Sequence, residues 1–255
     1  GASRLAREQV EFPVAVGVYQ GDWFQAAKIY RSWALQQKWT QKGPIAKRSD
    51  YPKKWRDFGF FLLVDGAPER IEAIMKDAQA KVAGRVPIGI HWYCWFQAPY
   101  NTCIDTAPTF EPLPGMPETT ARLTGMGQLV MPYIDAYLWS HGDPKFQQAV
   151  PATAKRENGE LYTEDYDVKC SVMCPCTPFW QNTILELCRN LVEKDHANAV
   201  YLDELGLQPP APCFDPGHGH PLGGGCHWVD GYRKMLEEIR KITAPRDIPI
   251  LVEAA

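Results

Sequence analysis

The amino-acid sequence predicts an α/β protein with a parallel sheet, interpreted as the N-terminal portion of a (β/α)8 TIM-type barrel. From residue 58 to the end, short apolar runs alternate with segments of helical periodicity. Each interval between two runs can hold a crossover helix, so the strands should be parallel with right-handed connections. About five strands and four helices use the available length, whereas a closed eight-stranded barrel needs more chain.

A complete doubly wound open sheet is the alternative architecture. Against it, the first predicted strand is followed by Asp65-Gly66-Ala67 and not by Gly-x-Gly-x-x-Gly. The sequence therefore indicates no dinucleotide or phosphate cradle at that turn.

The N-terminal part is expected to lie outside the barrel. Val10–Tyr19 alternates loosely and predicts one strand, which needs partners that this sequence does not supply. Asp22 is a candidate N-cap for an amphipathic helix over 22–37. The predicted organisation is the last strand of an upstream β domain, a connecting helix with a linker, and the partial barrel, at residues 1–20, 21–56 and 57–255.

The barrel elements follow from local patterns. Strands are predicted where β-branched and aromatic residues cluster, at residues 58–64, 86–95, 128–137, 199–202 and 248–252. Helices are predicted where an apolar stripe follows a capping residue or proline, at residues 68–84, 117–126, 177–192 and 230–242. Polar excursions without clear periodicity separate some of them, and the longest runs from 140 to 176.

Composition excludes several classes of partner. The chain has 255 residues, of which 45% are hydrophobic and 22% charged, a net charge of -3 and no block of Lys or Arg. This gives no electrostatic footprint for nucleic acid. The apolar runs are far shorter than the roughly 18 residues that cross a bilayer, so no membrane partner is expected. The eight Cys residues would allow disulfides in an exported protein, and a secreted or periplasmic location is expected.

Asp203 and Glu253 are the candidate catalytic residues. Each is the first carboxylate after an apolar strand, and the two strands should be neighbours, so both side chains should enter one cleft. One carboxylate can attack or activate water while the other protonates the leaving oxygen of a glycoside. A separation of about 5 to 5.5 Å would indicate retention, and about 6.5 to 9.5 Å inversion. The other interpretation is that both acids only cap helices or pair with Arg.

Other strand ends and loops offer groups that suit a sugar, namely polar His, Asp and Tyr beside flat Trp faces. Because side chains alternate along a strand, at most about half of them can face the site. The predicted substrate-binding residues are His91, Trp92, Trp95, Tyr133, Asp135, Trp139, Glu204, His218 and His220. No cofactor and no metal ligand is predicted.

The loop from 207 to 228 contains residues that could form a different kind of site, one that binds a metal ion. Cys213, His218, His220, Cys226 and His227 are residue types that bind zinc, yet their spacing matches none of the common zinc patterns. A zinc-dependent hydrolase that uses this loop is therefore an alternative function.

Several stretches resemble a family of largely uncharacterised, bacterial glycoside-hydrolase-like proteins. They are Gly21–Trp33, Val200–Gly206, His218–Gly225, Trp228 and Gly231–Arg233. The barrels of that family are similar to those of endo-alpha-N-acetylgalactosaminidases and, more distantly, of alpha-amylases. In these enzymes an Asp after the fourth strand is the nucleophile and a Glu after the fifth is the acid/base, and Asp203 and Glu253 match those places in order.

The resemblance implies a retaining glycosidase that acts on an alpha-linked oligosaccharide or polysaccharide, with a β-sandwich ahead of the barrel. Because the sequence ends at Ala255, the last three barrel strands, which usually complete substrate binding, are expected to be absent. A carbohydrate-binding or scaffold barrel without catalysis is the alternative from a different class.

Overall fold

The computed structural model describes residues 13–56, 58–82, 84–97, 111–166 and 168–253. The chain forms two compact units, residues 1–50 and 51–255. In the first unit, helix α1 (Trp23–Ala34) begins as predicted after Asp22, whose Oδ1 accepts the Phe24 backbone N–H at 3.0 Å. The strand predicted over Val10–Tyr19 does not form in its described part, residues 13–19, which have no strand partner within the described chain.

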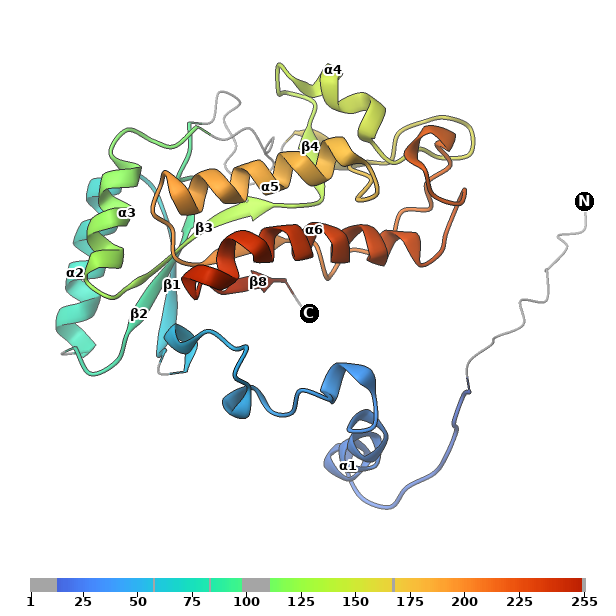
Figure 1. Cartoon of the computed structure of the whole chain (residues 1–255), viewed down its shortest axis with the longest axis horizontal. Coiled ribbons are helices and arrows are strands. Elements are labelled where there is room, and N and C mark those ends of the chain that lie inside the picture. Colours follow the sequence, from blue (N-terminus) through green and yellow to red (C-terminus); the bar gives the residue numbers. More distant parts are fainter. Residues whose placement is uncertain (1–12, 57, 83, 98–110, 167, 254–255) are drawn as a thin grey trace, which may run out of the picture. The chain divides into compact units, whose positions relative to one another are not determined.

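The second unit is built on a five-stranded parallel sheet (Figure 1). Its strands are β1 (Phe60–Asp65), β2 (Ile88–Tyr93), β3 (Leu129–Asp135), β7 (Val200–Asp203) and β8 (Ile250–Val252), in that spatial order. The prediction of these strands is confirmed. A doubly wound sheet would reverse its order at a switch point, whereas here each strand lies beside the next parallel one along the chain. The order is the one that the front of a (β/α)8 barrel would have.

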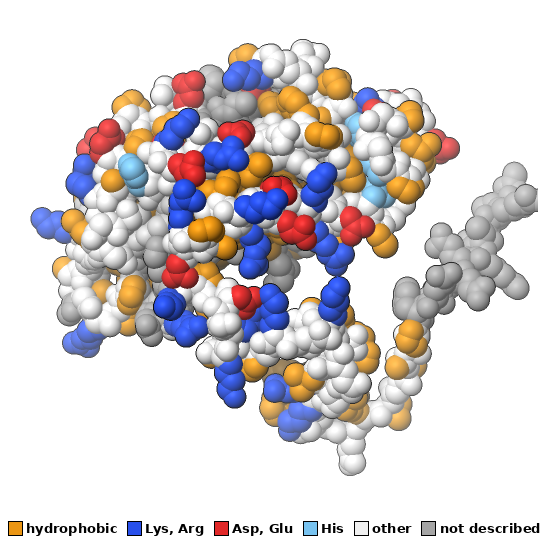
Figure 2. Space-filling model, in the orientation of Figure 1, with side chains coloured by type: hydrophobic (Ala, Val, Ile, Leu, Met, Phe, Trp, Pro, Cys, Tyr) orange, Lys and Arg blue, Asp and Glu red, His pale blue; other side chains and the backbone are white. Residues whose placement is uncertain are grey.

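Four longer helices connect these strands, close to the predicted positions. They are α2 (Pro68–Val82), α3 (Met116–Gly125), α5 (Pro178–Glu193) and α6 (His227–Thr243). Thr177 caps α5 by accepting the Trp180 backbone N–H, as its sequence predicts. Helices α5 and α6 pack side by side, and over them basic and acidic side chains are interspersed (Figures 1 and 2). Among the described residues, no helix is both long and apolar enough to cross a membrane.

A small antiparallel sheet occupies the excursion after β3. Its strands are β4 (Leu138–Ser140), β5 (Thr163–Asp165) and β6 (Lys169–Val172), in the order β4-β6-β5, with helix α4 (Phe146–Ala149) between β4 and β5. Sequence patterns did not predict them because strands of three or four residues show no period.

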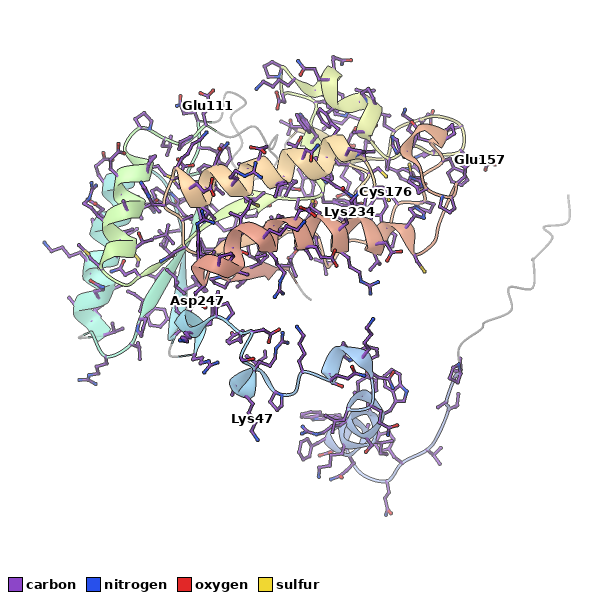
Figure 3. All side chains as sticks on the ribbon, viewed as in Figure 1. Lys47, Glu111, Glu157, Cys176, Lys234 and Asp247 are labelled. Carbon is purple, nitrogen blue, oxygen red and sulfur yellow. The ribbon has the colours of Figure 1, made fainter. Side chains whose placement is uncertain are left out.

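Short 3-10 turns complete the described structure. They are η1 (Lys38–Thr40), η2 (Ile45–Lys47), η3 (Lys53–Trp55), η4 (Val150–Ala152), η5 (Pro216–His218) and η6 (Ala244–Arg246). At η3 the carboxylate of Asp247, labelled in Figure 3, accepts the Lys53 backbone N–H at 3.1 Å.

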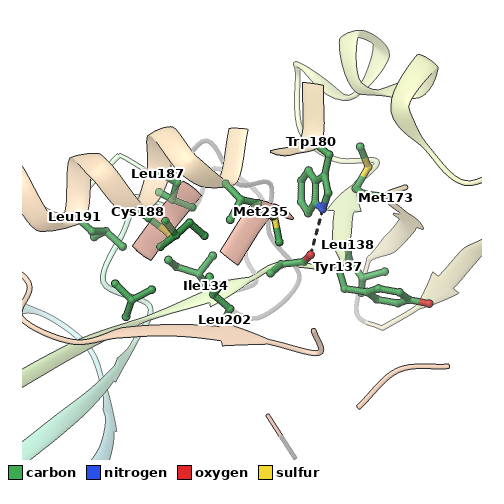
Figure 4. Packing of buried hydrophobic residues seen from close by; sticks show 14 of the residues in the cluster. Ile134, Tyr137, Leu138, Met173, Trp180, Leu187, Cys188, Leu191, Leu202 and Met235 are labelled. Carbon is green, nitrogen blue, oxygen red and sulfur yellow. Dashed lines mark hydrogen bonds between the residues drawn. The ribbon is translucent and has the colours of Figure 1, made fainter. Parts of the chain in front are cut away.

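One part of the core lies between the sheet and the pair α5 and α6 (Figure 4), and the same cluster of buried residues continues under α2 and α3. Ile134 of β3 and Leu202 of β7 are fully buried on the side that carries Leu187, Cys188 and Met235 of the helices. Trp180 is also fully buried, and its indole Nε1 donates to the Ala136 carbonyl at 3.2 Å. Since strand side chains alternate, the residues flanking Ile134 and Leu202 face away from this core.

Candidate functional site

Asp203 ends β7 and receives a hydrogen bond on each of its carboxylate oxygens. The Tyr133 hydroxyl donates to Oδ2 at 2.6 Å and the Tyr201 hydroxyl donates to Oδ1 at 2.8 Å. Tyr133 and Tyr201 are register partners on β3 and β7, two positions before the edge where Asp203 lies, so all three occupy the same face of the sheet. The carboxylate is therefore held in a defined orientation.

Glu253 follows β8 directly, and the parallel pairing of β8 with β7 places its carboxyl close to that of Asp203. Partial burial, followed by the charge of Asp203 and hydrogen bonding to its carboxyl, raises the pKa of Glu253 above its usual value. The structure thus brings the two strand-end acids together, with Glu253 as the acid that keeps its proton to higher pH than an ordinary glutamate.

The carboxyl separation of about 5 to 5.5 Å for retention, against about 6.5 to 9.5 Å for inversion, stays a prediction for the protein with a sugar bound between Asp203 and Glu253.

Aromatic rings line the same face beside Asp203. Tyr93 stacks on Tyr133 with ring centroids 4.5 Å apart, and His91 lies 4.3 Å from the Tyr201 ring. Burial, followed by the charges of Asp203 and Glu253, raises the pKa of Tyr93 to about 12. Burial lowers the pKa of His91 to about 4, against the opposing effect of Asp203. His91 is therefore neutral at pH 7, and its buried Nε2 has no hydrogen-bond partner among the described residues.

Asp135 lies on the same face, but its carboxylate is hydrogen-bonded to backbone N–H groups of the following turn. Its Oδ1 accepts the N–H groups of Tyr137 at 2.7 Å and Leu138 at 2.8 Å, which fixes the turn after β3. Burial, followed by the charge of Glu204, raises the pKa of Asp135 well above its usual value. Asp135 thus shapes the strand end next to Asp203.

Glu204 extends the acidic group. It has a left-handed backbone with φ of 59°, an unusual conformation for a residue other than glycine. Its Oε1 accepts the Tyr166 hydroxyl at 2.8 Å and the Gln208 amide at 3.1 Å, while its buried Oε2 has no partner among the described residues. Burial raises the pKa of Glu204.

Three predicted sugar contacts lie in the core instead. Trp92 is fully buried and donates to the Gly66 carbonyl at 3.1 Å, and Trp95 donates to the Tyr133 carbonyl at 2.8 Å. Trp139 is 2% exposed and stacks on Phe179. The structure therefore places these three indoles in the core and not beside the acid pair, and their contact with a sugar stays a prediction. For Trp92 the reason is alternation, because its neighbour His91 takes the face that carries Asp203.

His218 and His220 are also separate from the acid pair. Their ring nitrogens contact Cys213 and Cys174, each at 3.4 Å, in a cluster formed by two other segments of the chain. Tyr201, which donates to Asp203, and Tyr93, which stacks on Tyr133, were not among the predicted residues. The alternation of side chains along a strand indicates both, since Tyr201 lies two positions before Asp203 and Tyr93 two positions after His91.

Fold and site together define a parallel α/β protein with an acid pair at the carboxyl edge of its sheet. The chain belongs to the family described as a domain of unknown function, DUF6259, whose sequence model matches residues 9–253.

Two relatives carry glycosidase names. The chain is 28% identical over 242 residues to a Bacteroides thetaiotaomicron protein named "Putative glycoside hydrolase", covering 91% of this chain and 34% of that protein. It is 24% identical to "Putative glycoside hydrolase 22789" of Monosiga brevicollis, covering 98% of this chain and 24% of that protein. The chain thus spans about a third of the length of the first relative and about a quarter of the second.

Solved structures of glycosidases share the fold. The alpha-N-acetylgalactosaminidase NagBb of Bifidobacterium bifidum, in its complex with GalNAc, matches with a TM-score of 0.70 at 12% identity, over 92% of this chain and 41% of that one. A GH31 sulfoquinovosidase of E. rectale matches with a TM-score of 0.62 at 14% identity, over 80% of this chain and 32% of that one. At such identities the likeness concerns the fold alone.

Proposed function

We propose that this chain carries the catalytic acids of a glycoside hydrolase, with Asp203 as nucleophile and Glu253 as acid/base. One observation carries the proposal: Asp203 is held by two tyrosine hydroxyls while the neighbouring Glu253 has a raised pKa. One acid suited to act as a carboxylate and one suited to hold a proton are the two roles that glycoside hydrolysis requires. The glycosidase names of the relatives and the glycosidase folds support the same class.

The proposed reaction is the retaining hydrolysis of an alpha-linked oligosaccharide or polysaccharide. Asp203 attacks the anomeric carbon while the bond to the leaving oxygen breaks and Glu253 gives that oxygen its proton. Glu253 then removes a proton from water, which displaces Asp203 and releases the sugar. Retention requires the two carboxyls to lie about 5 to 5.5 Å apart around the bound sugar.

Two further parts of the proposal concern the whole protein. The five strands would be the front of a (β/α)8 barrel whose remaining strands complete substrate binding. The disulfide bond of Cys94 supports an exported location, because disulfides persist in oxidising compartments.

The test is hydrolysis of a panel of aryl alpha-glycosides by the full-length protein and its variants. Asp203→Asn should lower turnover by about 10³-fold or more, since it removes the attacking group. Glu253→Gln should lower turnover most for glycosides with poor leaving groups, because their leaving oxygen needs a proton from Glu253. Asp65→Asn is a matched control: this strand-end carboxylate forms a salt bridge with Arg70 at 3.1 Å. Wild-type turnover by Asp203→Asn would refute the assignment.

The closeness of the interacting carboxyls of Asp203 and Glu253 favours a second candidate, a carbohydrate-binding barrel without catalysis. In that case the acids would bind sugar hydroxyls and never separate. Glycan binding by the wild type, without hydrolysis of any glycoside and with loss of binding in Asp203→Asn, would identify this function.

A further inference from the structure

A second cluster of reactive side chains lies where the segment between β6 and α5 meets the loop between β7 and α6. It contains Cys174 from the first segment and Cys213, His218 and His220 from the loop. One sulfur or nitrogen from each lies within 4.8 Å of every other. The two cysteines and His218 are buried, and His220 is partly exposed. The sequence already indicated the three members from the loop as zinc-binding residue types, but it did not connect them with Cys174, which lies in a separate segment.

Backbone carbonyls orient both imidazoles toward the cysteines. His218 Nε2 lies 2.7 Å from the Pro151 carbonyl, and His220 Nδ1 lies 2.7 Å from the Pro221 carbonyl. A carbonyl only accepts, so each of these nitrogens carries the proton. The lone pair of the other nitrogen then faces a sulfur: His218 Nδ1 faces Cys213 and His220 Nε2 faces Cys174. Metal-binding histidines are typically held by this arrangement, with the free N–H donated to a carbonyl.

The distances fit a tetrahedral zinc ion. Zn–S bonds of about 2.3 Å and Zn–N bonds of about 2.0 to 2.1 Å place neighbouring sulfur and nitrogen ligands about 3.6 Å apart. In both Cys–His pairs of the cluster the sulfur–nitrogen distance is 3.4 Å. We propose that Cys174, Cys213, His218 and His220 bind a structural zinc ion.

A structural role follows from the number of ligands and from the loop. Four protein ligands complete the tetrahedron and leave no position for a reacting water, unlike a catalytic zinc site. The loop from Leu205 to Cys226 contains only the short turn η5 and a bridge between Cys213 and Gly223 as regular structure among the described residues. A zinc ion would tie this loop to the segment that begins α5.

Cys176 lies beside the cluster without belonging to it. Its Sγ lies 3.2 Å from the His227 carbonyl, to which the thiol donates, and Figure 3 shows it between the starts of α5 and α6. Cys226 is exposed and lies on the same loop. These two cysteines provide matched controls for the two proposed ligands.

The test is metal analysis of the full chain purified without added chelator, followed by titration of the metal-free protein with Zn²⁺ and Co²⁺. Zinc content should be about one ion per chain. Bound Co²⁺ should show the visible bands of tetrahedral coordination and a near-ultraviolet thiolate charge-transfer band. X-ray absorption should show two sulfur and two nitrogen ligands. The double variant Cys174→Ser/Cys213→Ser should lose the zinc, while Cys176→Ser and Cys226→Ser should keep it.

The role in folding has its own measurement. Removing zinc should speed amide hydrogen exchange in the loop from 205 to 226 and in the segment from 174 to 177, and Zn²⁺ but not Mg²⁺ should restore protection. These readouts do not depend on glycoside hydrolysis, so the zinc site and the proposed activity can fail separately.

Three results on the wild-type protein would overturn the proposal, even if the double variant does not fold. One is a metal-free protein that binds neither Zn²⁺ nor Co²⁺. Another is a Co²⁺ complex without the thiolate band. The third is a disulfide between Cys174 and Cys213, detected by mass spectrometry after alkylation of free thiols.

Discussion

The hydroxyl of Tyr133 on β3 donates to Oδ2 of Asp203 on β7 at 2.6 Å, across the boundary between two neighbouring strands. Because Tyr133 is also buried beside this carboxylate, its own pKa is raised and it stays a donor throughout the ordinary pH range. The pair sets the orientation of the proposed nucleophile.

Removing that donor should weaken catalysis without removing the nucleophile. In Tyr133→Phe we expect kcat/KM to fall about 10- to 100-fold, because a hydrogen bond to a charged group contributes about 1.5 to 3 kcal/mol. Steady-state kinetics on an aryl alpha-glycoside measure this fall in kcat/KM. Tyr162→Phe is the control, since the Tyr162 ring contacts Arg156 and not the acid pair. Unchanged kcat/KM in Tyr133→Phe would contradict a positioning role.

The raised pKa of Glu253 predicts the alkaline side of the pH profile. Glu253 must be protonated to act as an acid, so activity should decline as pH rises through its raised pKa. The same shift makes folding stability greatest below the ordinary pKa of a glutamate and lowers it as Glu253 loses its proton. In Glu253→Gln, residual activity on a substrate with a good leaving group should lack this decline. A profile identical to that of the wild type would exclude Glu253 as the titrating acid.

The neutral His91 predicts a loss of stability in mild acid. Its pKa is lowered to about 4 in the folded protein, against 6.5 for an unperturbed histidine. The unfolded chain therefore binds the proton more readily, and stability should decrease as pH falls from about 6.5 to about 4. His91→Gln should show a smaller decrease over this interval. Thermal unfolding at several pH values measures the difference, and equal slopes for the two proteins would count against the buried neutral imidazole.

Gly231 in α6 should resist substitution by alanine. A Cβ atom at Gly231 would lie 2.8 Å from the carbonyl carbon and oxygen of Pro175, which are backbone atoms and cannot rotate away. We expect Gly231→Ala to destabilise the protein by about 1 to 3 kcal/mol, although alanine favours helix by about 1 kcal/mol. Gly125 near the end of α3 has no atom within 4 Å of such a Cβ, so Gly125→Ala should be neutral or stabilising. Chemical denaturation measures the free energy of unfolding of both variants. Equal free energies for Gly231→Ala and Gly125→Ala would refute the close contact at Gly231.

Much of the parallel sheet could be predicted because buried strands and amphipathic helices differ in their hydrophobic period. That signal located β7 and its terminal Asp203, as well as β8 and the following Glu253. It did not reveal β4, β5 and β6, which are too short to show a period. Nor did it indicate which indoles would be buried, because Trp92 and His91 are adjacent in sequence but face opposite sides of the sheet.

The sequence by itself determined the order of the five parallel strands and their four connecting helices, and the presence of an acid after each of two strands, because these depend on local periodicity and turn residues. Only the tertiary structure decided that Tyr133 and Tyr201 both donate to Asp203, that Glu253 lies beside it, and that Cys174 joins the histidines of a distant loop. Such contacts depend on strand register and on where crossovers return the chain. Both are set by packing between segments that are remote in sequence.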